Sequence, residues 1–355
     1  MLMVAKAMLR PLTGIKVLDL SRILAGPHAA QSLADLGAEV TKVEAPWGDD
    51  TRTWGPPFQP GFDSVEVASY FLSCNRGKSI VVANIKQEKQ RIRELMDTAD
   101  VVLENFKPGG MERLLGGVRD DQILCRISGY GQFGPRCDEP AFDLTMQARS
   151  GIMSITGEPD RPPVKVGVAW IDVMTGMNAV SSILAALFHK ERTGKGCVID
   201  LSLWDTAIAA LVNQAHNALA GHHPRPMGSA HPNLVPYRVF QANDGWFAIG
   251  VGSTPQWTTL VRALNLNAPE EWSENANRIA QRDEVEAEVQ AVVQTHSRAD
   301  LEIMLKGVPC APVNSVMEAL EDPQSVARGS VSKHRNVPVL TSPLRLQPSN
   351  ENNEV

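Results

Sequence analysis

Short apolar runs alternate with helical runs over the first hundred residues, and this alternation constrains the fold more than any other feature. The predicted elements are strands at 15–20, 39–43, 79–85 and from 101 onward, and helices at 28–37 and 87–99. Strands separated by helices of this length form parallel β-α-β units in an open sheet. The sequence therefore predicts an α/β fold with a doubly wound, open parallel sheet.

Four segments with glycine or polar residues are predicted to follow strands directly. They are SRILAGP at 21–27, ENFKPGG at 104–110, SGYGQFGP at 128–135 and the turn around Asp172. In open α/β sheets, ligands bind outside the carboxyl ends of the strands. We therefore expect these segments to meet at one edge of the sheet and to form a single site.

Asp172 is a lone acidic residue between an apolar, strand-like run at 164–171 and a helical run of small residues that starts near Thr175. A carboxylate at such a turn can accept the free N–H groups of a helix. It can also act as a nucleophile and form a covalent intermediate. Spacing alone favours the capping role.

The run Gly129–Gly134 matches the dinucleotide fingerprint G-x-G-x-x-G and follows a predicted strand. It leads into a stretch containing Pro135 and Pro140, with no helix that could place a dipole on a pyrophosphate. The sequence therefore argues against NAD binding and favours a flexible loop over an active site. No G-x-S-x-G motif is present to suggest a serine hydrolase.

The composition of the chain argues against several classes of binding partner. A net charge of −6 and an aromatic content of 5% argue against binding of nucleic acid or of an anionic membrane. The apolar runs are too interrupted to predict a membrane span. Five scattered cysteines and the spacing of His222, His223 and His231 do not fit a disulfide framework or a metal site. We expect a cytoplasmic protein, or a mitochondrial one if the basic stretch at 1–10 is a eukaryotic presequence.

The second half predicts a helix at 177–190, a strand at 197–203 and a helix at 205–221, followed by a linker rich in Pro, His and Gly. Strands at 235–241 and 246–252, joined by a turn at Gly245, and several later helices predict a smaller α/β domain.

Six blocks of sequence, in this order and spacing, resemble the class III CoA-transferases. They are 12–46, 73–86, 101–114, 127–135, the Asp172 segment at 141–180, and 191–209. The resemblance implies a large Rossmann-like, CoA-binding domain at 1–205, a linker at 206–232, a small α/β domain at 233–320 and a truncated segment at 321–355 that returns towards the large domain and ends in a disordered tail. It also implies a homodimer of interlocked chains.

In this family an aspartate attacks the thioester of an acyl-CoA and passes CoA to a free carboxylic acid through aspartyl anhydride and aspartyl-CoA thioester intermediates. The resemblance places that aspartate at Asp172. It makes backbone N–H groups of Gly129, Gly131 and Ala230 candidates to stabilise an oxyanion, and Asp143 and Gln147 candidates to orient the reacting groups. It implies no metal or redox cofactor, because coenzyme A enters as a substrate.

The resemblance also implies a set of residues that bind coenzyme A, namely Leu24, Ala25, Ala83, Lys86, Asn105, Phe106, Lys107 and Arg113. These residue types suit an adenine cleft with cations for phosphates. Ala45 stands where the family often has an arginine, so we expect another cation, such as Arg52, to replace it.

Two alternatives remain. The related 2-methylacyl-CoA racemases need a histidine before the Asp of a G-H-D motif, and this chain has Phe142 there, which cannot transfer a proton. The chain is also shorter than the family pattern between Gly117 and Ser128 and ends soon after 342–349. An inactive or structurally shortened paralogue is therefore the main alternative.

The stretch 228–245 resembles that of transferases acting on short dicarboxylic acids such as succinate and glutarate. A cation would then meet the distal carboxylate, and Arg22 and Arg225 are the candidates. The sequence thus predicts a CoA-transferase that acts on an acyl-CoA and a short dicarboxylic acid.

Overall fold

The computed structural model describes residues 8–349 and divides into two compact units. Unit 1 comprises Met1–Ile152, Lys165–Gly221 and Pro323–Val355, and unit 2 comprises Met153–Val164 and His222–Asp322. Residues 1–7 and 350–355 lie outside the described part. The predictions of a presequence at the N-terminus and of a disordered tail therefore fall largely on residues that are not described.

These units differ from the predicted domains at two places. Residues 153–164 group with unit 2, where Gly228 donates a backbone hydrogen bond to Gly157 over 2.8 Å. Residues 206–221, predicted as the start of a linker, group with unit 1. There Ala207 is buried in the hydrophobic core, and Leu211 packs against it.

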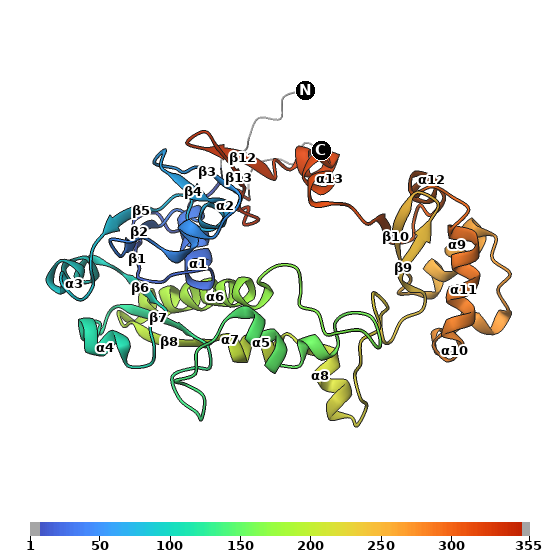
Figure 1. The fold of residues 1–355 in the computed structure, drawn as a ribbon, viewed down its shortest axis with the longest axis horizontal. Coiled ribbons are helices and arrows are strands. Elements are labelled where there is room, and N and C mark those ends of the chain that lie inside the picture. The colour runs from blue at the N-terminus through green and yellow to red at the C-terminus, as the bar shows by residue number, and fades with distance from the viewer. Residues whose placement is uncertain (1–7, 350–355) are drawn as a thin grey trace. The chain divides into compact units, whose positions relative to one another are not determined.

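Unit 1 is built on a six-stranded parallel sheet with the order β5-β2-β1-β6-β7-β8 (Figure 1). The strands are β1 (Lys16–Asp19), β2 (Glu39–Glu44), β5 (Ser79–Val82), β6 (Val101–Glu104), β7 (Ile123–Ser128) and β8 (Cys197–Ser202). Counted along the chain, the sheet has the order 3-2-1-4-5-6 of the Rossmann fold. The prediction of a Rossmann-like parallel sheet is confirmed.

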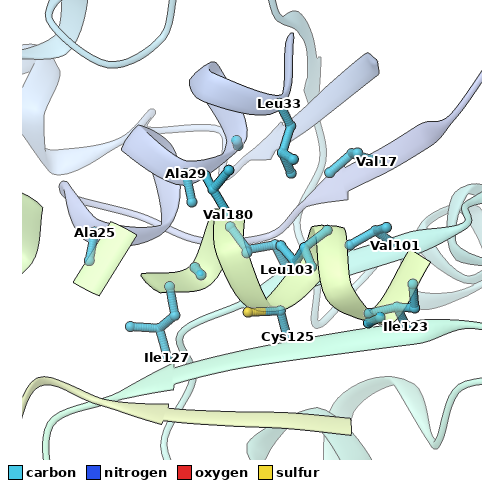
Figure 2. Packing of buried hydrophobic residues seen from close by; sticks show 14 of the residues in the cluster. Val17, Ala25, Ala29, Leu33, Val101, Leu103, Ile123, Cys125, Ile127 and Val180 are labelled. Atoms are coloured by element: carbon cyan, nitrogen blue, oxygen red, sulfur yellow. The ribbon is translucent and has the colours of Figure 1, made fainter. Parts of the chain in front are cut away.

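Helices cover both faces of this sheet, because its central strands are apolar on both sides. On one face, α1 (Ala25–Asp35) packs against α6 (Trp170–Thr193) and the strands. Figure 2 shows this cluster, in which Leu33, Val101 and Val180 are among the buried side chains. On the other face, α3 (Lys89–Thr98) and α4 (Gly110–Leu115) cover a second cluster.

Smaller elements complete unit 1. They are the hairpins β3 (Phe58–Pro60) with β4 (Glu66–Ala68) and β12 (Val331–His334) with β13 (Val337–Leu340), and the helices α2 (Ser69–Leu72), α5 (Asp143–Arg149), α7 (Leu203–Ala209), α8 (Val212–Leu219) and α14 (Pro323–Ala327).

Unit 2 has its own core around an antiparallel sheet of order β11-β10-β9. Its elements are β9 (Tyr237–Ala242), β10 (Gly245–Gly250), α9 (Thr254–Leu264), α10 (Asn275–Ala280), α11 (Arg282–Val293), α12 (Arg298–Met304), β11 (Cys310–Pro312) and α13 (Val316–Glu321). The prediction of a second α/β region with strands joined near Gly245 is confirmed.

Two local predictions are wrong. The run 164–171 forms no strand, and Val164 and Val168 are 46% and 57% exposed, so this apolar segment lies outside the sheet. The helix that follows begins at Trp170, which places Asp172 in its first turn. The single helix predicted at 205–221 is two helices, because Val212 adopts φ +42° and the helical conformation is interrupted there.

Among residues 8–349, α6 is the one helix long and apolar enough to cross a membrane by length and composition. Its buried residues include Ile171, Ala179 and Ile183, which belong to the core cluster between α1 and the sheet. This packing accounts for the apolar residues on the buried side of the helix.

Candidate active site

The strand order reverses between β1 and β6, and the segments that follow these two strands lie together. Asn105, after β6, accepts the backbone N–H of Arg22 over 3.1 Å and donates to its carbonyl over 2.9 Å. A topological switch point of this kind is where Rossmann-like sheets bind ligands.

Two pockets open at this point. The first, here called the Asp172 pocket, has a volume of about 120 Å³ and is lined by Arg22, Ile23, Leu24, Ala25, Asn105, Ile127, Ser128, Gly129, Ala141, Phe142, Asp172 and Leu203. The second, the Trp47 pocket, has a volume of about 320 Å³ and is lined by Leu20, Arg22, Val43, Ala45, Trp47, Ala83, Asn84, Ile85, Lys86, Phe106 and Leu114. Arg22 lines both, so the two pockets are neighbours.

The carboxylate that caps α6 comes from another helix. Asp143, at the start of α5, accepts the backbone N–H of Ile171 over 2.7 Å and that of Asp172 over 3.4 Å. Gln147 donates to the other oxygen of Asp143 over 2.5 Å and accepts from Val166 N–H over 2.9 Å. The capping role that spacing favoured for Asp172 therefore belongs to Asp143, and the Asp172 carboxylate lines the pocket.

Burial makes Asp172 an unusual carboxyl group. Desolvation, followed by repulsion from the charge of Asp143, raises the pKa of Asp172 to about 7. Perturbed carboxyl groups of this kind are typical of catalytic sites. Tyr70, which the sequence analysis did not single out, responds to the same charges: burial and then the negative charge of Asp172 raise the pKa of Tyr70 to about 12.

The glycine segment after β7 turns without forming a helix, as predicted. Gly129 lines the Asp172 pocket, and a Cβ atom there would come within 2.4 Å of the Ala141 side chain, so only glycine fits. The N–H of Gly131 donates to Ser128 Oγ over 2.9 Å. The Gly131 N–H is therefore occupied, and Gly129 is the glycine of the two that lines the pocket.

The candidate coenzyme A residues divide into three groups. Leu24, Ala25 and Asn105 line the Asp172 pocket, and Ala83, Lys86 and Phe106 line the Trp47 pocket. Lys107 and Arg113 are exposed and line neither pocket.

Two residues near Ala45, Arg52 and Trp47, differ from what the sequence suggested. Arg52, considered as the replacement cation, bonds Glu44 through two nitrogens at 2.7 and 3.1 Å and lies 3.8 Å above the Phe71 ring, so it is not free to bind phosphate. Trp47, which the sequence analysis missed, is 70% exposed at the rim of its pocket. An aromatic residue directly after a strand-end Ala-Pro was the available signal.

Ala230 and Arg225 belong to unit 2, and their assignments stay predictions. Within residues 8–349, no three His, Cys, Asp or Glu side chains are grouped so as to hold a metal ion.

Comparison with known proteins places the chain in a family. The model of CoA-transferase family III matches residues 12–353. Succinate–glutarate CoA-transferase of Agrobacterium fabrum is 43% identical over 90% of this chain and 84% of its own length. The human succinyl-CoA:glutarate CoA-transferase is 39% identical over 91% of this chain and 76% of its own length.

Solved structures agree as well. A CaiB/BaiF family protein from Brucella suis superposes with a TM-score of 0.86 at 42% identity, covering 97% of this chain and 94% of that protein. These matches span nearly the whole chain, and the named relatives are transferases rather than racemases. The chain belongs to CoA-transferase family III and is a CoA-transferase.

Proposed function

We propose that this enzyme moves CoA from an acyl-CoA to a short dicarboxylic acid and that Asp172 is its nucleophile. The single observation behind this proposal is the placement of Asp172. It is a desolvated carboxyl with a pKa of about 7 in a pocket at the switch point of a Rossmann-like sheet. The neighbouring Trp47 pocket is large enough for part of a nucleotide.

The reaction needs two exchanges on the same carboxyl group. Asp172 attacks the acyl carbon of the donor, the carbon–sulfur bond breaks, and an aspartyl anhydride and the CoA thiolate form. The thiolate attacks the aspartyl carbon, releases the donor acid and leaves an aspartyl-CoA thioester. The acceptor carboxylate attacks that thioester to give a second anhydride, and the thiolate then takes the acceptor acyl group and frees Asp172.

No electron or net proton is gained or lost in this cycle, so Asp172 and the CoA thiolate are sufficient for every covalent step. We propose accordingly that the enzyme needs no resident metal or redox cofactor. A carboxylate is a weak nucleophile, so catalysis depends on position and on dipoles directed at the developing oxyanion. The N–H of Gly129 is our candidate for such a dipole, whereas that of Ala230, in unit 2, already donates to the Met227 carbonyl over 2.9 Å.

Coenzyme A would extend across both pockets. Its thioester would lie beside Asp172, Leu24 and Ala25, and its adenine beside Ala83 and Phe106 in the Trp47 pocket. Lys86 lines the same pocket and would face a phosphate. The exposed Lys107 and Arg113 would add attraction from the rim.

The acceptor class rests on the relatives, two of which are named for succinate or succinyl-CoA and glutarate. A second carboxylate on the acid needs a cation, and Arg22 lines the Asp172 pocket. Arg22 pairs with Asp50 at 3.1 Å, with the two side chains 55% and 44% exposed. Exposed pairs contribute little stability, so Arg22 can exchange Asp50 for a substrate carboxylate at small cost. Arg225 lies in unit 2, and its assignment stays a prediction.

We also propose that the enzyme is a homodimer. Met177, Leu184 and Phe188 on α6 are 59%, 37% and 64% exposed, and their spacing places them along one side of the helix. A second copy of the chain would cover this apolar stripe. Light scattering should then give twice the chain mass, and Phe188→Glu should give the mass of one chain.

The five cysteines, none of which forms a disulfide, lead us to propose a reducing compartment such as the cytoplasm.

Intact-protein mass spectrometry tests the mechanism directly. The protein is mixed briefly with succinyl-CoA, alone and with hydroxylamine, which traps activated carboxyl groups as hydroxamates. A CoA-sized adduct or a hydroxamate mapped to Asp172 is the expected result, and Asp172→Ala should abolish it. Absence of any adduct from folded protein with a panel of acyl-CoA donors would favour the inactive paralogue.

A further inference from the structure

A network of buried charges lies beneath the segment that joins β1 to α1. The segment, residues 21–27, forms part of the Asp172 pocket through Arg22, Ile23, Leu24 and Ala25. The network consists of three acidic and three basic side chains, which are Asp19, Glu44, Asp49, Lys42, Arg52 and Lys78. The paired ions of Lys42 with Asp49 and of Lys78 with Asp19 are fully buried.

Lys78 is bound on all sides. Its Nζ lies 2.9 Å from each of three oxygens, on Asp19, on Asn75 and on the backbone of Pro27. Three acceptors require three N–H donors, which an ammonium has and a neutral amine lacks. Lys78 therefore holds the far end of the segment through the Pro27 carbonyl while neutralising Asp19.

Lys42 holds the near end. Its Nζ donates to the Ser21 carbonyl over 2.8 Å and lies 3.0 Å from Asp49 Oδ2. Asp19 accepts both the N–H and the hydroxyl of Ser21. Two of the carbonyls between Ser21 and Pro27 also accept hydrogen bonds. The Arg22 carbonyl accepts from the Asn105 amide, and the Ile23 carbonyl accepts from Cys74 Sγ at 3.7 Å.

The segment needs these bonds because its backbone is strained. Ile23 has φ +73°, a left-handed conformation that β-branched residues rarely adopt. Such a conformation persists only where the surroundings over-determine it, and it is typical of ligand sites. Here three consecutive carbonyls and that of Pro27 are each bound by a buried or half-buried side chain from another part of the fold.

We propose that Lys78 and Lys42 are positioning residues for CoA transfer, because they set the wall of the Asp172 pocket before substrate binds. They act through the backbone of 21–27 and need not touch the substrate. A preset wall avoids ordering the segment during each catalytic cycle, and misplacement by about 1 Å can cost on the order of 100-fold in rate. The inference rests on the proposed function for its kinetic test but not for its structural one.

The structural test uses the unmodified protein and hydrogen exchange read by mass spectrometry, with and without coenzyme A. The amides of Ser21, Arg22 and His28 are hydrogen bonded. The expected result is slow exchange of these three amides in the free protein and little further change with coenzyme A. Exchange at the rate of an unstructured chain, with protection only after coenzyme A is added, would overturn the inference.

The kinetic test replaces a buried ion pair by neutral residues of similar volume, Lys78→Met with Asp19→Asn, so that no unpaired charge remains in the interior. With succinyl-CoA and glutarate, kcat should fall about 30- to 100-fold while KM for succinyl-CoA changes less than about threefold. The matched control is Arg76→Met with Asp35→Asn, a nearby ion pair that does not bond residues 21–27. This control should keep kcat.

The outcomes are distinct. Equal kcat in both double variants would overturn the positioning role. If the Lys78 variant does not fold, the hydrogen-exchange result still decides whether the segment is ordered before substrate binds, and fast exchange would overturn the inference. If unmodified protein transfers no CoA, the proposed function fails, while slow exchange of the three amides would still establish the preset segment.

Discussion

The burial of Asp172 should make the enzyme less stable at the pH where it works, and Asp172→Asn should reveal this cost. The folded-state pKa of about 7 lies above the value of 3.8 for a free aspartate. Between these values the folded protein holds a proton that the unfolded chain has lost. The stabilisation from this carboxyl is therefore complete below about pH 4 and is lost as the pH rises to about 7.

The size of the effect follows from that interval. Each pH unit corresponds to about 1.4 kcal/mol, so roughly 4 kcal/mol is lost over the whole range and about 3 kcal/mol between pH 5 and pH 8. Asparagine has no charge to desolvate. The free energy of unfolding of Asp172→Asn, relative to the unmodified protein, should therefore be about 3 kcal/mol larger at pH 8 than at pH 5. Solvent around the partly exposed side chain makes this an upper value.

Urea titration at the two pH values measures the effect. Hydrogen exchange of peptides from β6 and β7 reports the unfolding of unit 1 alone. This restriction is needed because the two units need not unfold together. Asp120→Asn is the control, since that residue is exposed in unit 1. A gain for Asp172→Asn that is the same at both pH values would refute the reasoning, because Asp172 would then ionise as an ordinary surface carboxyl does.

Three further predictions concern activity. In the unmodified enzyme, kcat/KM should fall about tenfold per pH unit below about pH 7, since the nucleophile must be ionised; a flat profile from pH 5 to 8 would contradict this. Asp143→Asn removes a negative charge, lowers the pKa of Asp172 and should move that acidic limb to lower pH, which a pH–rate profile would detect. Trp47→Ala should raise KM for the acyl-CoA about tenfold at unchanged kcat if Trp47 stacks on adenine; an unchanged KM would exclude that contact.

The sequence predicted the main strands of the parallel sheet and several of the residues that meet in the Asp172 pocket. The strands that end at Asp19, Glu104 and Ser128 were predictable from short aliphatic runs, and a parallel sheet brings their carboxyl ends to one edge. Leu24, Asn105, Gly129 and Asp172 therefore reached one pocket as expected.

The local structure around Asp172 was not predictable in the same way. The run at 164–171 has the composition of a strand, but Asp143, 29 positions before Asp172, caps the helix and lets it start at Trp170. A bond between residues so far apart has no signal in a local window. The left-handed Ile23 is invisible for the same reason, since it depends on side chains from several other parts of the chain.

The buried charges beneath 21–27 have a consequence for how this enzyme can change over evolution or in the laboratory. With three positive and three negative side chains, any single replacement of a charge leaves an unbalanced ion in the interior, so a change must occur in compensating pairs. The apolar part of the pocket wall, formed by Ile127, Ala141, Phe142 and Leu203, has no such restriction, because these side chains carry no charge. New acceptor acids are therefore more accessible through single substitutions on that apolar wall, while the segment after β1 remains a constant part of the scaffold.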